Sequence, residues 1–362
     1  MKTLYRRLLA GVLACAIGTL PLAAVAAPFT GLVIFGDSLS DTGNNAIVFD
    51  NIIGPPLPAG TLRTPVPIAS PGFIPDFPYA SGRYSNGPVW VEQVAASMGL
   101  QAAPSLAGGS NFAYGGARVG QLTSPVPYSL TLRDQVAMFM AGSGGHAPAG
   151  DLFVVQGGGN DARDALAMIA AGGNPASLIS AYVSGMVAIV SDLAAAGGDH
   201  FLLLNVPDLG KAPAVQALGL ATATAASAIS LAFNTALNAT LAQLPTSVTD
   251  ELMLLDLFNL QNQVFSDPAF FNINDLTSAC AFSAACIASP AGTFYWDGIH
   301  PTSAGGHAII AGAVMAQVPV PGSVYLLALG LFALAMTHRR AWNRLPGRPR
   351  SPANVILARP SP

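Results

Sequence analysis

Four continuous apolar runs constrain the fold of this chain more than any other feature. They begin at Gly31 ("GLVIFGD"), Asp151 ("DLFVVQGGGND"), His200 ("HFLLLNVPD") and Glu251 ("ELMLLDLF"). Each run is bounded by glycine, proline or aspartate and is apolar throughout rather than at every second position. Continuous apolar character is typical of strands that are buried on both faces of a parallel sheet.

Long alanine-rich stretches separate these runs, including residues 175–196 and 218–244, and their composition favours helices. Strands that alternate with helices predict an α/β fold in which a central parallel sheet lies between two layers of helices. In such folds the functional groups gather where the strands end.

The two ends of the chain are typical of targeting segments. Residues 1–26 carry Lys2, Arg6 and Arg7, then an apolar run and "AVAA", which predicts a secretory signal peptide with cleavage near Ala26. An alternative reading takes "VLAC", ending at Cys15, as a lipoprotein acylation site. Either reading predicts an exported protein.

Residues 318–340 combine "VPVP", an uncharged apolar stretch over residues 322–337 and two arginines, and an arginine-rich tail follows at 341–362. This layout resembles the PEP-CTERM class of bacterial surface-sorting signals, although the usual glutamate is absent and the tail is longer. The resemblance implies contact with a sorting machinery and, before processing, with the membrane. An ordinary C-terminal anchor helix is the alternative. We expect a protein of the cell surface, the outer envelope or the medium.

Between these ends we expect one catalytic domain over residues 27–317. Its proline-rich segment 47–79 lacks helical or strand periodicity and predicts an insertion at the substrate entrance, or a surface insertion without a role. Of the 362 residues only 9% are charged, and the net charge is −3, which argues against nucleic acid as a partner.

Cys280 and Cys286 remain after the signal peptide. In an exported protein their close spacing favours a local disulfide, and two sulfurs without a histidine cluster predict no metal site.

Ser38 follows the first apolar run, where a chain that turns toward a helix would expose its hydroxyl at the sheet edge. A helix cap is the alternative role for this serine, and the chain has no G-x-S-x-G elbow. The best base lies in "FYWDGIHPTSAGGH", where Asp297 and His300 are three residues apart, so that the carboxylate can reach one ring nitrogen while the other faces outward. His307 lies further on and is interpreted as structural.

A serine nucleophile needs donors for the oxyanion that its attack creates. Gly116 in "GSNFAYGGARVG" offers a backbone N–H, and Asn160 in "QGGGND" offers a side-chain amide. Each has an ordinary alternative, because glycine pairs mark plain turns and Asn160-Asp161 could cap a helix.

The four stretches GDSLS, N-F-A-x-G-G, G-G-x-N-D and D-G-x-H-P-T occur in that order, each at an expected strand exit. Together with "SGRYSNGPVWVEQVA" from Ser81, they resemble the GDSL or SGNH hydrolase family over about residues 32–316, in its extended "GDSLSDTGN" branch. The resemblance implies a flavodoxin-like three-layer sandwich that needs no cofactor. It assigns the following roles: Ser38 as nucleophile, His300 as base, Asp297 as its orienter, the backbone N–H groups of Ser38 and Gly116 and the amide of Asn160 as oxyanion donors, and Asp37, Asp41 and Asn44 as residues that shape the loop.

The sequence thus predicts a secreted esterase or lipase that forms an acyl-enzyme. Two alternatives stay open: the same triad acting as an acyltransferase, phospholipase or polysaccharide deacetylase, and a surface matrix protein with an inert hydrolase fold.

Overall fold

The structure, a computed structural model, describes residues 29–53, 75, 78–79, 81–120 and 130–318, without the side chains of 50–53. The predicted signal peptide, the predicted sorting segment from residue 319 on and the arginine-rich tail lie outside the described residues. Phe29–Val318 form one compact unit.

The four apolar runs form a parallel sheet in the order β1-β2-β3-β4, as predicted. Its strands are β1 (Gly31–Phe35), β2 (Asp151–Gln156), β3 (His200–Leu204) and β4 (Leu252–Leu255). The register pairs Phe35 with Val155 and Gln156 with Leu204, so the carboxyl ends of β1, β2 and β3 lie at one edge. Residues that follow these strands are therefore brought together.

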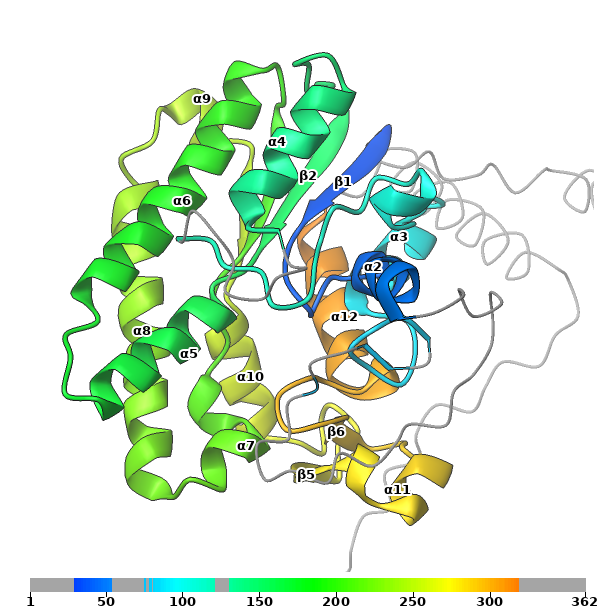
Figure 1. Ribbon diagram of the computed structural model, residues 1–362, viewed down its shortest axis with the longest axis vertical. Helices are drawn as coiled ribbons and strands as arrows, with labels where there is room; N and C mark the ends of the chain where they lie inside the picture. Colours follow the sequence, from blue (N-terminus) through cyan, green and yellow to red (C-terminus); the bar gives the residue numbers. More distant parts are fainter. Residues whose placement is uncertain (1–28, 54–74, 76–77, 80, 121–129, 319–362) are drawn as a thin grey trace, which may run out of the picture. The chain divides into compact units, whose positions relative to one another are not determined.

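Helices cover both faces of this sheet (Figure 1). On one face lie α4 (Leu132–Gly142), α5 (Gly159–Ala170), α6 (Ala176–Ala195) and α8 (Leu220–Leu241), and on the other lie α3 (Trp90–Ser97) and α12 (Ala308–Gln317). Alternate strand residues enter the two cores: Val33, Phe35, Phe153, Val155, Phe201 and Leu203 face the first layer, and Leu32, Ile34, Leu152, Val154, Leu202 and Leu204 are buried on the other side. The three-layer α/β/α prediction is confirmed.

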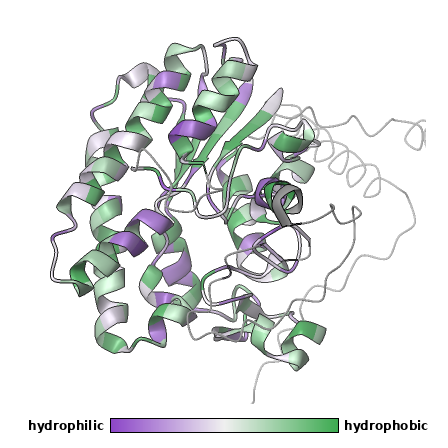
Figure 2. Ribbon diagram, viewed as in Figure 1, coloured by the Kyte–Doolittle hydropathy of each residue, from purple (hydrophilic) through white to green (hydrophobic). Residues whose placement is uncertain are grey.

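Two of the described helices, α6 and α8, are long and apolar enough to cross a membrane by length and composition. Both pack into the core instead, through buried residues such as Tyr182, Met186 and Phe233. Figure 2 shows apolar residues along the sheet and a mixture of apolar, intermediate and polar residues on the helices around it. The hydropathy of α6 and α8 is therefore that of helices that pack against a core.

A short segment, Ser110–Tyr114, extends the sheet beyond β1. The Phe112 N–H donates to the Ile34 carbonyl (2.7 Å), the Ile34 N–H donates to the Ser110 carbonyl (3.0 Å), and Ile34 and Asn111 form a parallel bridge. With this segment counted as the second strand in the chain, the strand order becomes 2-1-3-4-5, the flavodoxin-like order. The topological switch point then lies between β1 and β2, where ligands bind in doubly wound folds.

The predicted start of the proline-rich insertion was wrong. Residues 44–53 form α2 (Asn44–Ile53), because the first proline occurs only at Pro55 and the Asp41 carboxylate accepts the N–H groups of Gly43 and Asn44, both at 2.8 Å. Residues 54–74 lie outside the described residues. Ser38 itself lies in a single turn rather than at a helix start, since α2 begins six residues later.

A second, two-stranded sheet joins β5 (Asp275–Ala279) and β6 (Thr293–Tyr295), and β6 leads directly to Asp297. A disulfide joins Cys280 and Cys286, which both lie in the connection from β5 to β6. The remaining α-helices are α7 (Pro213–Gln216), α9 (Thr246–Thr249), α10 (Leu257–Ser266) and α11 (Ala284–Ala288).

Candidate active site

Ser38, His300 and Asp297 meet in one chain of hydrogen bonds. His300 Nε2 lies 2.8 Å from Ser38 Oγ, and His300 Nδ1 lies 2.7 Å from Asp297 Oδ2. Asp297 is fully buried, and His300 and Ser38 are 2% and 8% exposed. Residues 262 positions apart are thus brought into the arrangement that a serine nucleophile and its base require.

The hydrogen-bonding roles of the two ring nitrogens of His300 follow from their partners. An ionised carboxylate only accepts hydrogen bonds, so Asp297 holds the proton on His300 Nδ1 and leaves Nε2 as an acceptor for the Ser38 hydroxyl. Asp297 Oδ1 accepts the backbone N–H groups of Ile299 (2.8 Å) and His300 (2.7 Å), which keeps Oδ2 directed at the ring.

The turn after β1 fixes Ser38. The N–H groups of Ser40 and Asp41 donate to the Asp37 carbonyl (both 3.0 Å), and the Leu39 N–H donates to Asp37 Oδ1 (3.0 Å). Burial raises the pKa of Asp37 above its ordinary value. This aspartate shapes the turn, as the family resemblance implies.

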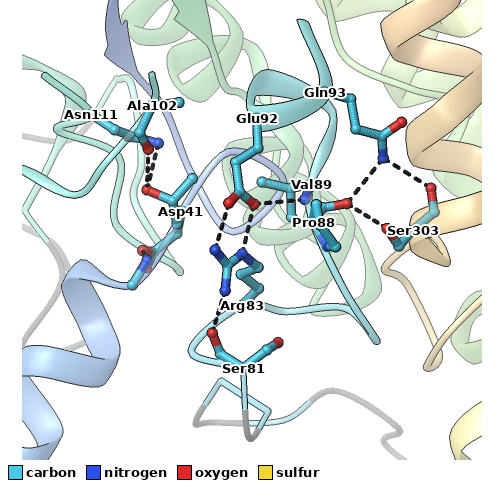
Figure 3. Close-up of polar contacts among 12 residues, drawn as sticks. Asp41, Ser81, Arg83, Pro88, Val89, Glu92, Gln93, Ala102, Asn111 and Ser303 are labelled. Atoms are coloured by element: carbon cyan, nitrogen blue, oxygen red, sulfur yellow. Dashed lines mark hydrogen bonds and ion pairs between the residues drawn. The ribbon is translucent and has the colours of Figure 1, made fainter. Parts of the chain in front are cut away.

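The segment from Ser81 holds the loop that follows His300. The Ser85 hydroxyl donates to the Pro301 carbonyl (2.8 Å), and the Gln93 amide donates to the Ser303 carbonyl (3.0 Å). Figure 3 shows the Gln93 contact and, beside it, the pairing of Arg83 with Glu92, which secures the start of α3. The segment thus supports the loop that follows His300.

Gly116 lies in a left-handed conformation (φ 83°) on the loop that pairs with β1. Its N–H belongs to the same peptide group as the Gly115 carbonyl, which accepts from Asn45 Nδ2 (2.9 Å), while the Gly115 N–H donates to Asp41 Oδ2 (2.9 Å). In a trans peptide the N–H points opposite to the C=O, so Asn45 determines the direction of the Gly116 N–H. Polar residues of "GDSLSDTGNN" therefore organise the loop that contains Gly116.

Asn160 lies in the first turn of α5 and is not its cap residue, which is Gly158. Its Nδ2 donates to the Ala117 carbonyl (2.9 Å), which ties Asn160 to the Gly116 loop. Gly158 adopts φ 101°, and a Cβ there would lie 2.4 Å from the Tyr182 ring. This position of the "GGGND" stretch requires glycine for the tight exit from β2.

Three residues near the site carried no signal in the sequence. The Tyr79 hydroxyl donates to Asp297 Oδ2 (3.1 Å), Arg118 donates to the Gly116 carbonyl (2.6 Å), and Arg163 donates to Asn160 Oδ1 (3.2 Å). The Tyr79 contact joins segments that are far apart in the sequence. The two arginine contacts depend on the direction of the side chain, which the sequence does not show.

His307, interpreted as structural, is fully buried in the turn before α12. Its Nδ1 accepts the Trp90 N–H (3.3 Å). Burial, and secondarily the neighbouring His300, lowers the pKa of His307 to about 3.

An apolar cavity adjoins the loops that carry the triad. Leu39, Ile299 and Pro301, neighbours of Ser38 and His300 in sequence, line it together with residues of α10 and α12. Among the described residues no three histidine, cysteine, aspartate or glutamate side chains cluster as metal ligands would.

A doubly wound α/β fold with a Ser-His-Asp arrangement at its switch point is typical of serine hydrolases. Within this class the chain belongs to the GDSL-like lipase/acylhydrolase family, whose model matches residues 32–313.

Individual relatives are distant. The chain is 28% identical over 280 residues to the phosphatidylcholine-sterol acyltransferase of Aeromonas hydrophila, a match that covers 74% of this chain and 71% of that protein. It is 38% identical over 102 residues to acetylajmalan esterase 2 of Rauvolfia serpentina, covering 26% of this chain and 25% of that protein. Among solved structures it is similar to LAE5, an α/β hydrolase from the metagenome of Lake Arreo, with 16% identity, a TM-score of 0.43 and coverage of 82% and 97% of the two chains.

Proposed function

We propose that this protein is an exported serine hydrolase that cleaves carboxylic esters through a Ser-His-Asp triad. The observation that carries the proposal is the continuous contact from Ser38 Oγ through both ring nitrogens of His300 to the buried Asp297 carboxylate. This chain of contacts supplies a hydroxyl, an acceptor for its proton and a group that orients the acceptor.

The reaction proceeds in two steps. His300 Nε2 takes the proton of Ser38 as Oγ attacks the ester carbonyl, and the oxyanion is stabilised by the N–H groups of Ser38 and Gly116 and by Asn160 Nδ2. Collapse breaks the bond to the alcohol, which leaves with the proton from His300. Water, deprotonated by His300, then attacks the acyl-enzyme and releases the acid and Ser38.

The apolar cavity beside Leu39 and Ile299 supports esters of apolar acids as substrates. The disulfide between Cys280 and Cys286 supports export, because disulfides persist in oxidising compartments. Acyl transfer to an alcohol instead of water is the second candidate. It is supported by the similarity to a bacterial acyltransferase, which covers 71% of that protein.

Hydrolysis of p-nitrophenyl esters by the Ser38→Ala variant tests the proposal. We expect kcat to fall by a factor on the order of 10³ or more with folding intact, because the nucleophile is removed. Ser40→Ala is the matched control: Ser40 lies two residues on but bonds Gln156 Oε1 (2.8 Å) and receives the Trp90 indole N–H (3.2 Å). Retained activity in Ser38→Ala would place the nucleophile elsewhere.

Product analysis in the presence of a long-chain alcohol separates the two candidates. A hydrolase releases free acid, whereas an acyltransferase forms the new ester in proportion to the alcohol.

A further inference from the structure

Two of the three proposed oxyanion donors, Gly116 and Asn160, each accept a hydrogen bond from an arginine. In Arg118 the guanidinium Nη1 donates to the Gly116 carbonyl (2.6 Å), while its Nε and Nη2 bond the Asp164 carboxylate (3.0 and 2.9 Å). In Arg163, which precedes Asp164 on α5, Nη1 donates to Asn160 Oδ1 (3.2 Å). The loop that contains Gly116 and the first turns of α5 are thereby joined.

Arg163 differs from the other arginines in the described part of the chain. Arg83, Arg118 and Arg133 each form an ion pair with a carboxylate, whereas the side-chain hydrogen bond that Arg163 makes to a described residue goes to the neutral amide of Asn160. Burial, and then the charge of Arg118, lowers the pKa of Arg163. Among the described residues no carboxylate forms an ion pair with Arg163, and the charges of Asp164, Asp37 and Asp297 offset part of the effect of burial by raising its pKa.

The contact determines which way the Asn160 amide faces. An amide side chain can turn by 180°, which would exchange its oxygen and nitrogen. Arginine has donors only, so it requires Oδ1 on its side, and the Ala117 carbonyl requires Nδ2 on the other (2.9 Å). One Nδ2 hydrogen is used by Ala117, and the second is left for an oxyanion.

We infer that Arg163 is a positioning residue of the oxyanion hole, which fixes the Asn160 amide as a donor and adds positive potential behind it. The inference rests on the proposed function, since it needs Asn160 to contact the oxyanion. Arg163 acts through Asn160 and makes no contact with substrate. A fixed donor stabilises the transition state more than it stabilises the bound ester. Loss of the Arg163 contact should therefore lower kcat and leave KM nearly unchanged.

A double-mutant cycle tests this role with Arg163→Met, Asn160→Ala and the variant that carries both. We expect Arg163→Met to lower kcat for a neutral p-nitrophenyl ester by about 10- to 100-fold, somewhat less than loss of an oxyanion donor itself, and to change KM by less than about threefold. In the Asn160→Ala background the same change should cost less than about threefold, because the group it positions is absent. Arg163→Lys, which keeps a cationic donor, should restore part of kcat.

Arg133→Met is the matched control, since Arg133 is exposed and pairs with Asp192 on the surface. It should leave kcat and KM unchanged. Unfolding midpoints of all variants are measured alongside, so that a loss of kcat in a stably folded protein is separated from unfolding.

Three results would overturn the inference: an unchanged kcat in Arg163→Met, an equal loss with and without Asn160, or a loss confined to esters that carry an anionic group, which would make Arg163 a substrate contact. The rate at which a fluorophosphonate labels Ser38 is a second readout that does not require ester turnover. If esters are not cleaved but labelling of Ser38 is slowed by Arg163→Met, the proposed function fails while the inference stands. Absence of labelling at Ser38 in the wild-type protein contradicts both.

Discussion

At the scale of single residues, the carboxylate of Asp297 carries out two tasks with its two oxygens. Oδ1 accepts two backbone N–H groups of its own loop, and Oδ2 accepts from His300 and from the Tyr79 hydroxyl. The first task shapes the loop and the second sets the tautomer of the base. The two tasks respond differently to substitution.

Asp297→Asn separates them. The asparagine Oδ1 can still accept the backbone N–H groups of Ile299 and His300, but Nδ2 would face His300 Nδ1 and force the ring proton to Nε2. We expect a fall in kcat on the order of 10³ to 10⁴, smaller than for His300→Ala, because part of the base function persists without its orienter. Asp192→Asn on the surface is the control. An unchanged kcat in Asp297→Asn would remove the carboxylate from the mechanism.

Ser38, Asp297 and His300 could be proposed from the sequence because a strand exit and a spacing of three residues mark them weakly, and the four stretches in their order mark them together. Tyr79, Arg118 and Arg163 have no such marks. Their partners lie in other loops or depend on how a side chain turns, so only tertiary packing identifies them.

At the scale of elements, the four strands were predictable because burial on both faces demands apolar residues throughout. The segment Ser110–Tyr114 was not, since it is short, partly polar and pairs mainly through its backbone with Ile34. Helix α2 was missed for a related reason: its start depends on the buried Asp41 carboxylate, and the prolines that follow hide its end.

The turn that leads into α12 predicts a dependence of stability on pH. Because burial lowers the pKa of His307 to about 3, the unfolded chain binds a proton between about pH 6.5 and 3 that the native state does not. The free energy of unfolding should therefore fall as the pH falls through this window, by about 3 kcal/mol at pH 4 from this group alone. Asp41, whose pKa burial raises to about 6, acts in the opposite direction over part of the window.

Urea unfolding of the wild-type protein and of His307→Gln at several pH values isolates the histidine, because Asp41 is common to both. We expect the wild type to be the more stable at pH 7 and to lose this advantage at pH 4. A difference that stays constant with pH would show that His307 titrates normally in the folded protein.

At the scale of the whole molecule, every residue assigned to the mechanism lies in the compact unit Phe29–Val318. We therefore propose that this unit is the catalytic domain and that residues 1–28 and 319–362 direct its location. A chain limited to 29–318 should unfold cooperatively and cleave p-nitrophenyl esters with the kcat of the full-length protein. A loss of kcat of tenfold or more in a folded truncation would show that a terminal segment contributes to the site.

The central claim is that Ser38 is a nucleophile activated by His300. Treatment with a fluorophosphonate followed by peptide mass spectrometry measures this directly, because the reagent bonds only to an activated hydroxyl. The account predicts one adduct, on the peptide that contains Ser38, with none in Ser38→Ala and much slower formation in His300→Ala. An adduct on another serine, or no adduct in the folded wild-type protein, would contradict it.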